Sequence, residues 1–151
     1  MAKLKILMTA ERFPPNVFGG GEFSAYFVAK TMAKKHAVHV ITSKTQKKND
    51  DIKFNEIQIP SSMQVHRLVK PSGDLLPGFI QNHEAYYVKS FRVINSFLKK
   101  HDGFDLLHSM SMNMVVGTVQ AAKKHNIPVI ATVNDHWATC FFRSHFRNCF
   151  S

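Results

Sequence analysis

Apolar residues along the chain occur in short runs that alternate with longer segments of helical periodicity. The run at residues 4–8 is almost entirely apolar, which is typical of a central strand in a parallel sheet covered on both faces. The segment at 22–35 carries apolar residues at helical spacing, so we predict a packing helix with its aromatic rings in the core. Its apolar face consists of Phe23, Phe27, Val28, Ala29 and Met32.

The alternation of strand and helix continues along most of the chain. Strand patterns occupy residues 37–42, 53–59, 64–69, 104–108 and 127–133, and helical patterns occupy 79–101 and 112–125. Polar or turn-rich segments at 44–51 and 71–78 are predicted to be loops. Strands that alternate with helices are typical of βαβ units. The predicted fold class is a three-layer, Rossmann-like α/β domain with a mainly parallel sheet, helices on both faces and the first strand in mid-sheet.

The two later helices differ in character. The helix at 79–101 is amphipathic and basic, and we expect it to cover the sheet; the alternative is a helix that lies on an anionic membrane surface. The helix at 112–125 is predicted to turn its valines and one alanine inward. These are Val115, Val116, Val119 and Ala122. The neighbouring methionines, Met110, Met112 and Met114, are expected to fill the core.

Composition limits the class of protein. The 151 residues suffice for one domain with a core, and a hydrophobic content of 44 % fits a globular protein. No run approaches the roughly 18 consecutive apolar residues of a membrane span. The opening residues lack the pattern of a secretory signal, so a cytoplasmic location is expected. Two cysteines do not make a disulfide framework.

The formal charge of +10 indicates an anionic partner. The candidates are a nucleotide diphosphate, nucleic acid and an acidic lipid surface. We do not expect nucleic acid, because the basic residues are dispersed and no helix-turn-helix, zinc-finger or RNA-binding motif is present. Many of the lysines form pairs at the ends of predicted helices, where they favour the negative end of the helix dipole.

A glycine-rich turn connects the first predicted strand to its helix. Pro14 and Pro15 stiffen this turn, and Gly19, Gly20 and Gly21 directly precede the helix. A helix that begins after such a turn points unpaired N–H groups at its mouth, which favours a phosphate group there. The spacing is neither the dinucleotide fingerprint nor the P-loop. A connector with no ligand is therefore the alternative.

Polar side chains also follow the later strands. His108, Ser109 and Ser111 stand at the end of one predicted strand, and Asn134, Asp135 and His136 follow the last one. Ligands gather at the carboxyl ends of strands in open α/β sheets. His108 is equally consistent with a structural hydrogen-bonding role, and Asp135 with a helix or turn cap.

Two classes of site are not expected. Thr42, Ser43 and Lys44 stand where a nicotinamide-binding site has its acidic residue, and the dinucleotide fingerprint is missing, so we do not expect a nicotinamide dehydrogenase. The second class is a zinc site near the C-terminus. Its two histidines and two cysteines, His136, Cys140, His145 and Cys149, lack the spacing of a zinc finger, and we expect no bound metal.

Two of these motifs together resemble the family four glycosyltransferases of the GT-B group. The first is Pro14-Pro15, a short spacer and the three glycines followed by Glu22 and a helix. The second comes after the last strand, where the family often has His-Asp, an aromatic residue, Trp and a later Cys. This chain has Asn134-Asp135-His136-Trp137 and then Cys140. Asn134 replaces the family's histidine and cannot exchange a proton near neutral pH, so no acid or base role is assigned to it.

The resemblance implies one domain, residues 1–151, that forms the N-terminal, acceptor-side half of a glycosyltransferase. Its partners would be a sugar or lipid-linked acceptor and a C-terminal GT-B domain in cis or in trans, without which we expect no activity. The donor would be a nucleotide-diphosphate sugar, with no other cofactor. Residues expected to bind donor or acceptor are Gly19, Gly20, Gly21, Glu22, His108, Ser109, Asn134 and Asp135; catalytic candidates are Asp135 and His136. Peripheral contact with an anionic membrane is a further expectation. The alternative function is a non-catalytic basic module or a split-enzyme subunit that binds a catalytic partner, anionic lipid or nucleic acid.

Overall fold

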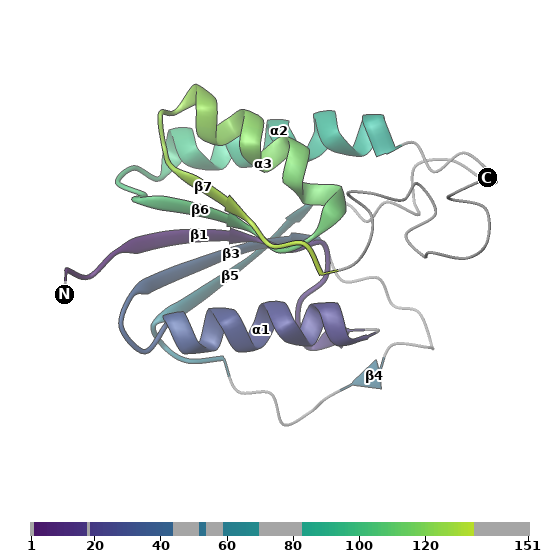
Figure 1. Cartoon of the computed structure of the whole chain (residues 1–151), viewed down its shortest axis with the longest axis vertical. Coiled ribbons are helices and arrows are strands. Elements are labelled where there is room, and N and C mark those ends of the chain that lie inside the picture. Colours follow the sequence, from purple (N-terminus) through teal and green to yellow (C-terminus); the bar gives the residue numbers. More distant parts are fainter. Residues whose placement is uncertain (1, 18, 44–51, 54–58, 70–82, 135–151) are drawn as a thin grey trace.

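A five-stranded parallel sheet forms the centre of the domain (Figure 1). The computed structural model describes residues 2–17, 19–43, 52–53, 59–69 and 83–134. The strands lie in the order β5 (Met63–Val69), β3 (Ala37–Ser43), β1 (Lys5–Thr9), β6 (Leu106–Ser109) and β7 (Val129–Ala131). Every neighbouring pair is parallel. The predicted mid-sheet position of the first strand is therefore confirmed.

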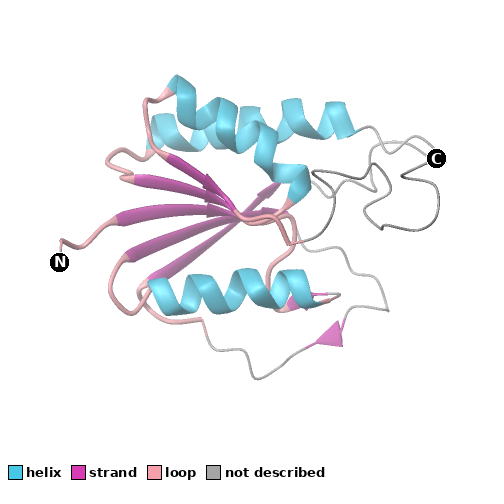
Figure 2. Cartoon of the chain, viewed as in Figure 1, coloured by secondary structure: helices cyan, strands magenta, loops and turns pink. Residues whose placement is uncertain are grey.

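Helices cover both faces of this sheet. Figure 2 shows α1 (Gly20–Met32) on one face, and α2 (His83–Lys100) and α3 (Met112–Lys124) on the other. The predicted three-layer, Rossmann-like α/β fold is therefore confirmed, and α2 covers the sheet beside α3 as expected. None of the described helices is both long and apolar enough to cross a bilayer.

The strand predicted at 53–59 is described only at its two ends, Lys53 and Ile59. Lys53 belongs to β4 (Ile52–Lys53), which pairs antiparallel with β2 (Asn16–Val17) in a separate two-stranded sheet. β2 was not predicted, because two residues in a proline-containing turn show no periodicity. The predicted loops at 44–51 and 71–78 lie outside the described residues.

The sheet separates two apolar clusters, because alternate residues of each strand point to opposite faces. Ile6 and Met8 pack toward α1, whereas Leu7 packs toward α2 and α3. β3 repeats this division, with Val40 on the first side and Ile41 on the second. The central strands are thus buried on both faces, as their apolar sequences predict.

The inward face of α1 differs from the prediction. Ala25, Tyr26 and Ala29 are buried, whereas Phe27 is 57 % exposed. Phe23 is half-buried, and its ring stacks on that of Phe27 with centroids 6.3 Å apart. The prediction that the aromatic rings of this helix lie in the core is therefore wrong for Phe27. Small side chains against the sheet allow α1 to approach it closely.

The inward face of α3 also differs from the prediction. Val115, Val116 and Val119 are only half-buried, although Ala122 is fully buried as predicted. The fully buried residues of the helix are Asn113, Met114, Gly117, Thr118, Ala121 and Ala122. Of the three methionines, Met110 and Met114 are buried, and Met112 is half-buried.

Close contact with α2 explains this face. A Cβ placed on Gly117 would lie 2.2 Å from Ser90 Oγ and 2.6 Å from the backbone nitrogen of Phe91. Only a residue without a side chain fits where the two helices cross. A prediction from apolarity alone places valines there, but their volume does not fit.

We predict that Gly117→Ala destabilises the domain. The added methyl group meets backbone atoms of α2 that cannot rotate away, and such overpacking costs about 1–3 kcal/mol. Urea denaturation followed by circular dichroism measures the change. Unchanged stability would show that α2 shifts at no cost.

Two histidines stack where β3 and β5 adjoin α2. His39 Nδ1 lies 3.1 Å from His66 Nε2, and the two rings are nearly parallel at 2°. Phe104 packs edge-on against His39, and Phe97 lies 4.6 Å from the His66 ring centroid. Burial, followed by the positive charges of His66, Lys5 and His101, lowers the pKa of His39 to about 4.

This pair predicts a loss of stability in mild acid. The unfolded chain binds a proton on His39 near the ordinary pKa of 6.5, whereas the folded chain binds it only near 4. Stability is therefore complete above pH 6.5 and is lost as the pH falls toward 4. Denaturation midpoints across this range should fall less in His39→Asn than in a control, His125→Asn. An equal fall in both variants would contradict the assignment.

Candidate functional site

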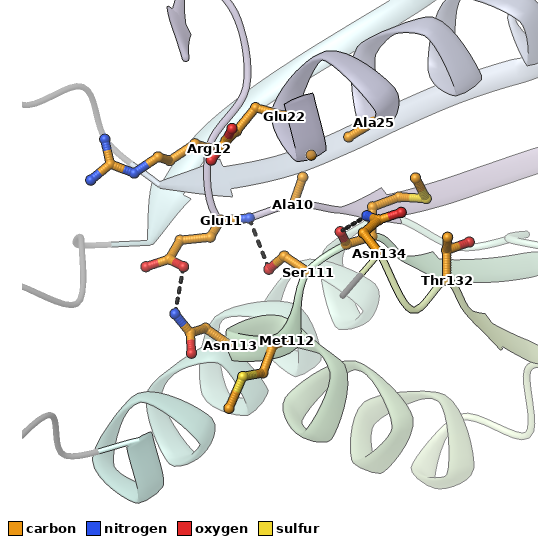
Figure 3. A pocket seen from close by; sticks show the side chains of 12 residues that line it. Ala10, Glu11, Arg12, Glu22, Ala25, Ser111, Met112, Asn113, Thr132 and Asn134 are labelled. Carbon is orange, nitrogen blue, oxygen red and sulfur yellow. Dashed lines mark hydrogen bonds between the residues drawn. The ribbon is translucent and has the colours of Figure 1, made fainter. Parts of the chain in front are cut away.

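A cavity of about 150 Å³ lies at the carboxyl end of the sheet (Figure 3). Four segments line it: the residues after β1, the first turns of α1, the residues after β6 and those after β7. The lining residues are Ala10, Glu11, Arg12, Gly21, Glu22, Ala25, Met110, Ser111, Met112, Asn113, Thr132 and Asn134. We call this cavity the cleft.

The strand order explains the position of the cleft. From β1 the chain adds β3 and β5 on one side of the sheet and then crosses to add β6 and β7 on the other. The connections that leave β1 and β6 lead to α1 and α3 on opposite faces, so the ends of these two strands diverge. A crevice at such a switch point is the usual ligand site of open α/β sheets.

Glu11 is held at the centre of the switch point. Its backbone N–H donates to Ser111 Oγ at 3.2 Å, and its carbonyl accepts from the N–H of Ser43 at 3.0 Å. The hydroxyl groups of Thr42 and Ser43 donate to the same carbonyl. Asn113 Nδ2 donates to Glu11 Oε2 at 2.5 Å. The end of β3 and the residue before α3 therefore fix the Glu11 backbone, and α3 holds its carboxylate in the wall of the cleft.

Thr42 and Ser43 thus serve a structural purpose at the end of β3. Both are buried, and both hydrogen-bond the chain after β1. Their hydroxyl groups are therefore used within the domain, in holding the residues that follow β1.

The three glycines precede and open α1. Gly19 caps the helix in an extended conformation at φ −163°, and its N–H donates to Glu22 Oε2 at 2.9 Å. A Cβ on Gly20 or Gly21 would meet no atom within 4 Å. Neither glycine has a positive φ. The packing of the described chain therefore does not require glycine at these two positions.

Space and hydrogen-bond donors coincide at the start of α1. Gly21 lines the cleft, and no described residue accepts a hydrogen bond from the N–H of Gly20 or Gly21. The first N–H groups of a helix have no partner within it and carry partial positive charge. Open space before such donors suits an anionic group.

The residues after β7 complete the wall. Asn134 Nδ2 donates to the carbonyl of Met110 at 3.2 Å, so its side chain is held between the ends of β6 and β7. Figure 3 shows Asn134 and Thr132 on the side of the cleft that faces Glu11 across Ser111. The Thr132 hydroxyl bonds His108 Nε2 at 2.8 Å.

His108 and Ser109 lie behind this wall. His108 is 6 % exposed, and among the described residues no group bonds its buried Nδ1. Burial lowers the pKa of His108 from its ordinary value, which favours the neutral imidazole. Ser109 is 1 % exposed, and its hydroxyl donates to the carbonyl of Ser111 at 3.4 Å. Neither side chain reaches the cleft, although each orients a residue that does.

Of the predicted binding residues, Gly21, Glu22 and Asn134 meet in one cavity. Gly19 and Gly20 lie beside them at the start of α1 without lining it. Asp135 and His136 lie outside the described residues, as do Cys140, His145 and Cys149 of the rejected zinc site. Within the described ranges, no group of three or more His, Cys, Asp or Glu residues is placed to hold a metal ion.

Sequence reasoning missed four residues of the cleft: Glu11, Arg12, Asn113 and Thr132. Each comes after a strand end by one to four residues, which was the signal used for Ser111 and Asn134. The strand order was needed in addition, because only the ends of β1, β6 and β7 converge here.

The fold and the cleft define a class of protein. A parallel sheet with helices on both faces and a polar cleft at its switch point, beside a helix that begins with glycines, form a Rossmann-like α/β domain. The family model of Glycosyltransferase Family 4 matches residues 18–149 of this chain. The chain belongs to this family.

Comparison of the structure with solved structures agrees on the fold. UGT2 of Phytolacca americana, complexed with UDP-2fluoro-glucose and pterostilbene, has a TM-score of 0.55 at 15 % identity over 87 % of this chain. A UGT transferase from Siraitia grosvenorii in complex with UDP has a TM-score of 0.57 at 17 % identity over 88 % of this chain. The chain covers only 30 % and 28 % of these two proteins.

The same fold also occurs outside glycosyltransferases. The C-terminal domain of a hydrogenase from Pyrococcus furiosus has a TM-score of 0.58 at 14 % identity, over 88 % of this chain and 94 % of that one. Structural likeness at this identity therefore defines the fold alone, and the family assignment rests on the sequence. A comparison with curated proteins finds no match.

The open space around Gly20 and Gly21 predicts that Gly20→Ala with Gly21→Ala stabilises the domain. Alanine fits the helix without contact and reduces the entropy of the unfolded chain, which is worth about 0.4–1 kcal/mol per site. Urea denaturation followed by circular dichroism measures the change in stability. Gly117→Ala is the matched control, because the same substitution is expected to lower stability there. A destabilised double variant would mean that the chain itself requires these glycines.

Proposed function

We propose that this chain is the acceptor-side domain of a nucleotide-sugar-dependent glycosyltransferase, whose active site a second domain completes over the cleft. The observation that carries the proposal is the start of α1. There, two glycines that the described packing does not require leave N–H donors open beside a polar cleft. Membership of Family 4 supports glycosyl transfer as the chemistry.

The donor's diphosphate would bind at the start of α1. The N–H groups of Gly20 and Gly21 donate to its oxygens, and the absent Cβ atoms allow the phosphates to approach the backbone. Arg12 supplies the cation among the residues that line the cleft. Glu22 has another role: its carboxylate accepts the Gly19 N–H and fixes the helix start. Uridine diphosphate sugars are the first donors to test, because the two plant enzymes are complexed with UDP or a UDP-sugar.

The acceptor would bind across the switch point. The Glu11 carboxylate accepts a hydrogen bond from the hydroxyl group of the acceptor substrate, and Asn134 contributes a neutral amide to the same wall. His108 and Ser109 position the wall from behind, and Asp135 and His136 come after it in the chain. In the reaction, the bond from the sugar's anomeric carbon to the diphosphate breaks, a bond to the acceptor oxygen forms, and the acceptor loses its proton.

Stabilising the leaving diphosphate is the main chemical task of this domain. Fixed donors that point to a developing negative charge lower the barrier, because they need no rearrangement as the charge appears. The start of α1 has this property: its amides are held by the helix and its cap, whatever occupies the cleft.

The proposed diphosphate site predicts that replacing Gly20 and Gly21 weakens phosphate binding while it raises the stability of the domain. Pyrophosphate and UDP, titrated into the isotope-labelled chain, should shift the amide resonances of Gly20 and Gly21. The Gly20→Ala, Gly21→Ala variant should bind about tenfold more weakly although it is more stable, because methyl groups occupy the phosphate position. The control Gln120→Ala, on the exposed surface of α3, should bind normally. Shifts confined to lysine-rich helix ends would contradict the proposal.

The acceptor site predicts an effect on KM. In the complete two-domain enzyme, Glu11→Gln should raise the acceptor KM about tenfold or more, since hydrogen bonds to charged groups contribute about 1.5–3 kcal/mol. The donor KM should change little. Steady-state kinetics with varied acceptor and donor separate the two. An effect on the donor alone would remove Glu11 from the acceptor site.

A further inference from the structure

A second cavity lies at the edge of the sheet, between the edge strand β5 and α2. Its volume is about 460 Å³, within the roughly 300–1,000 Å³ of small-molecule sites. The lining residues are His66, Leu68, Arg92, Val93, Ser96, Phe97, Lys100 and His101. None of them lines the cleft. In Figure 1, β5 is the outermost strand on the side of the sheet away from β7. We call this cavity the edge groove.

The walls of the edge groove combine apolar and basic side chains. Leu68 is 41 % exposed, and Val93 and Phe97 line the groove beside it. The basic groups are Arg92 and Lys100 of α2, with His66 and His101. No acidic side chain is among the lining residues. Such a wall offers apolar contact and positive charge together.

Aromatic rings order one end of the edge groove. The Phe97 centroid lies 4.6 Å from that of His66 and 4.4 Å from that of His101. His66 in turn stacks on His39. The imidazoles are thus held in place by ring contacts before any ligand arrives.

We propose that the edge groove binds a monomeric amphiphilic anion, an apolar ring or short chain that carries a carboxylate, sulfonate or phosphate group. Covering the exposed part of Leu68 is favourable at about 25 cal/mol per Å² of apolar surface. Arg92 and Lys100 are charged at neutral pH and attract the anionic group. Glycosyl transfer in the cleft does not require this ligand, so the proposal stands apart from the proposed function.

Protonation of the histidines should be linked to binding. The described groups around His66 include no acidic side chain: they are His39 of β3, His101 after α2, and Arg92 and Lys100 of α2. Burial and then the charge of His101 lower the pKa of His66, so the free groove holds this ring neutral at neutral pH. A bound anion favours the protonated, positively charged form of this histidine. Affinity should therefore rise as the pH falls from about 8 to 6.

The test uses 2-naphthalenesulfonate, with 2-naphthalenemethanol as the neutral probe and inorganic phosphate as the anion without an apolar part. Calorimetry and amide resonances of the full chain should detect the sulfonate in the edge groove, with at least about tenfold weaker binding of either other probe. Arg92→Glu with Lys100→Glu should abolish binding. Lys34→Glu with Lys35→Glu, an exposed pair after α1 on the other face, is the control with the same charge change and should bind normally.

Several results would overturn the proposal. Equal loss of affinity in both charge-reversal variants would mean that net charge alone attracts the probe. Equal binding of the neutral probe would remove the anionic requirement. Binding to anionic vesicles without binding of the monomeric sulfonate would assign the surface to membranes instead. An affinity that does not change between pH 8 and 6, in a chain that remains folded by circular dichroism, would remove the histidines from the site.

Discussion

The parallel pairing of β1 with β3 on one side and β6 on the other is the constraint on which the rest of the structure depends. It places β1 in mid-sheet, where helices cover both of its faces, and it also fixes the residues at the carboxyl end of this strand. Glu11 receives hydrogen bonds from Thr42 and Ser43 on one side and is bonded to Ser111 and Asn113 on the other. The same pairing therefore stabilises the core and positions the carboxylate in the cleft.

The glycines divide into two groups with opposite physical roles. Gly117 permits the crossing of α2 and α3, where a methyl group would meet backbone atoms. Gly20 and Gly21 allow no such close contact within the described chain, since a Cβ at either position would meet open space. A helical glycine costs up to about 1 kcal/mol relative to alanine. Two such residues side by side, next to N–H groups that no described residue accepts, are what the proposed diphosphate site requires.

Sequence reasoning predicted those features that depend on local pattern. The main strands, the helices, the central position of β1 and the class of fold all follow from periodicity and from βαβ alternation. It failed where the close packing of elements decides which side chains are buried. Phe27 is exposed because alanines pack α1 against the sheet. Val115 is only half-buried because Gly117 occupies the point where α2 and α3 cross. Glu11 and Asn113 were missed for a similar reason. They lie 102 positions apart, and only the strand order brings them together.

The described walls of the cleft indicate what chemistry this domain contributes. They hold carboxylates, amides, hydroxyls, one guanidinium and open backbone N–H groups, but no imidazole. His108 lies behind Thr132, and the Asn134 side chain cannot exchange a proton near neutral pH. These groups are suited to orienting hydroxyl groups and to stabilising a departing anion. In the proposed glycosyl transfer, these described groups would position the substrates and stabilise the departing diphosphate.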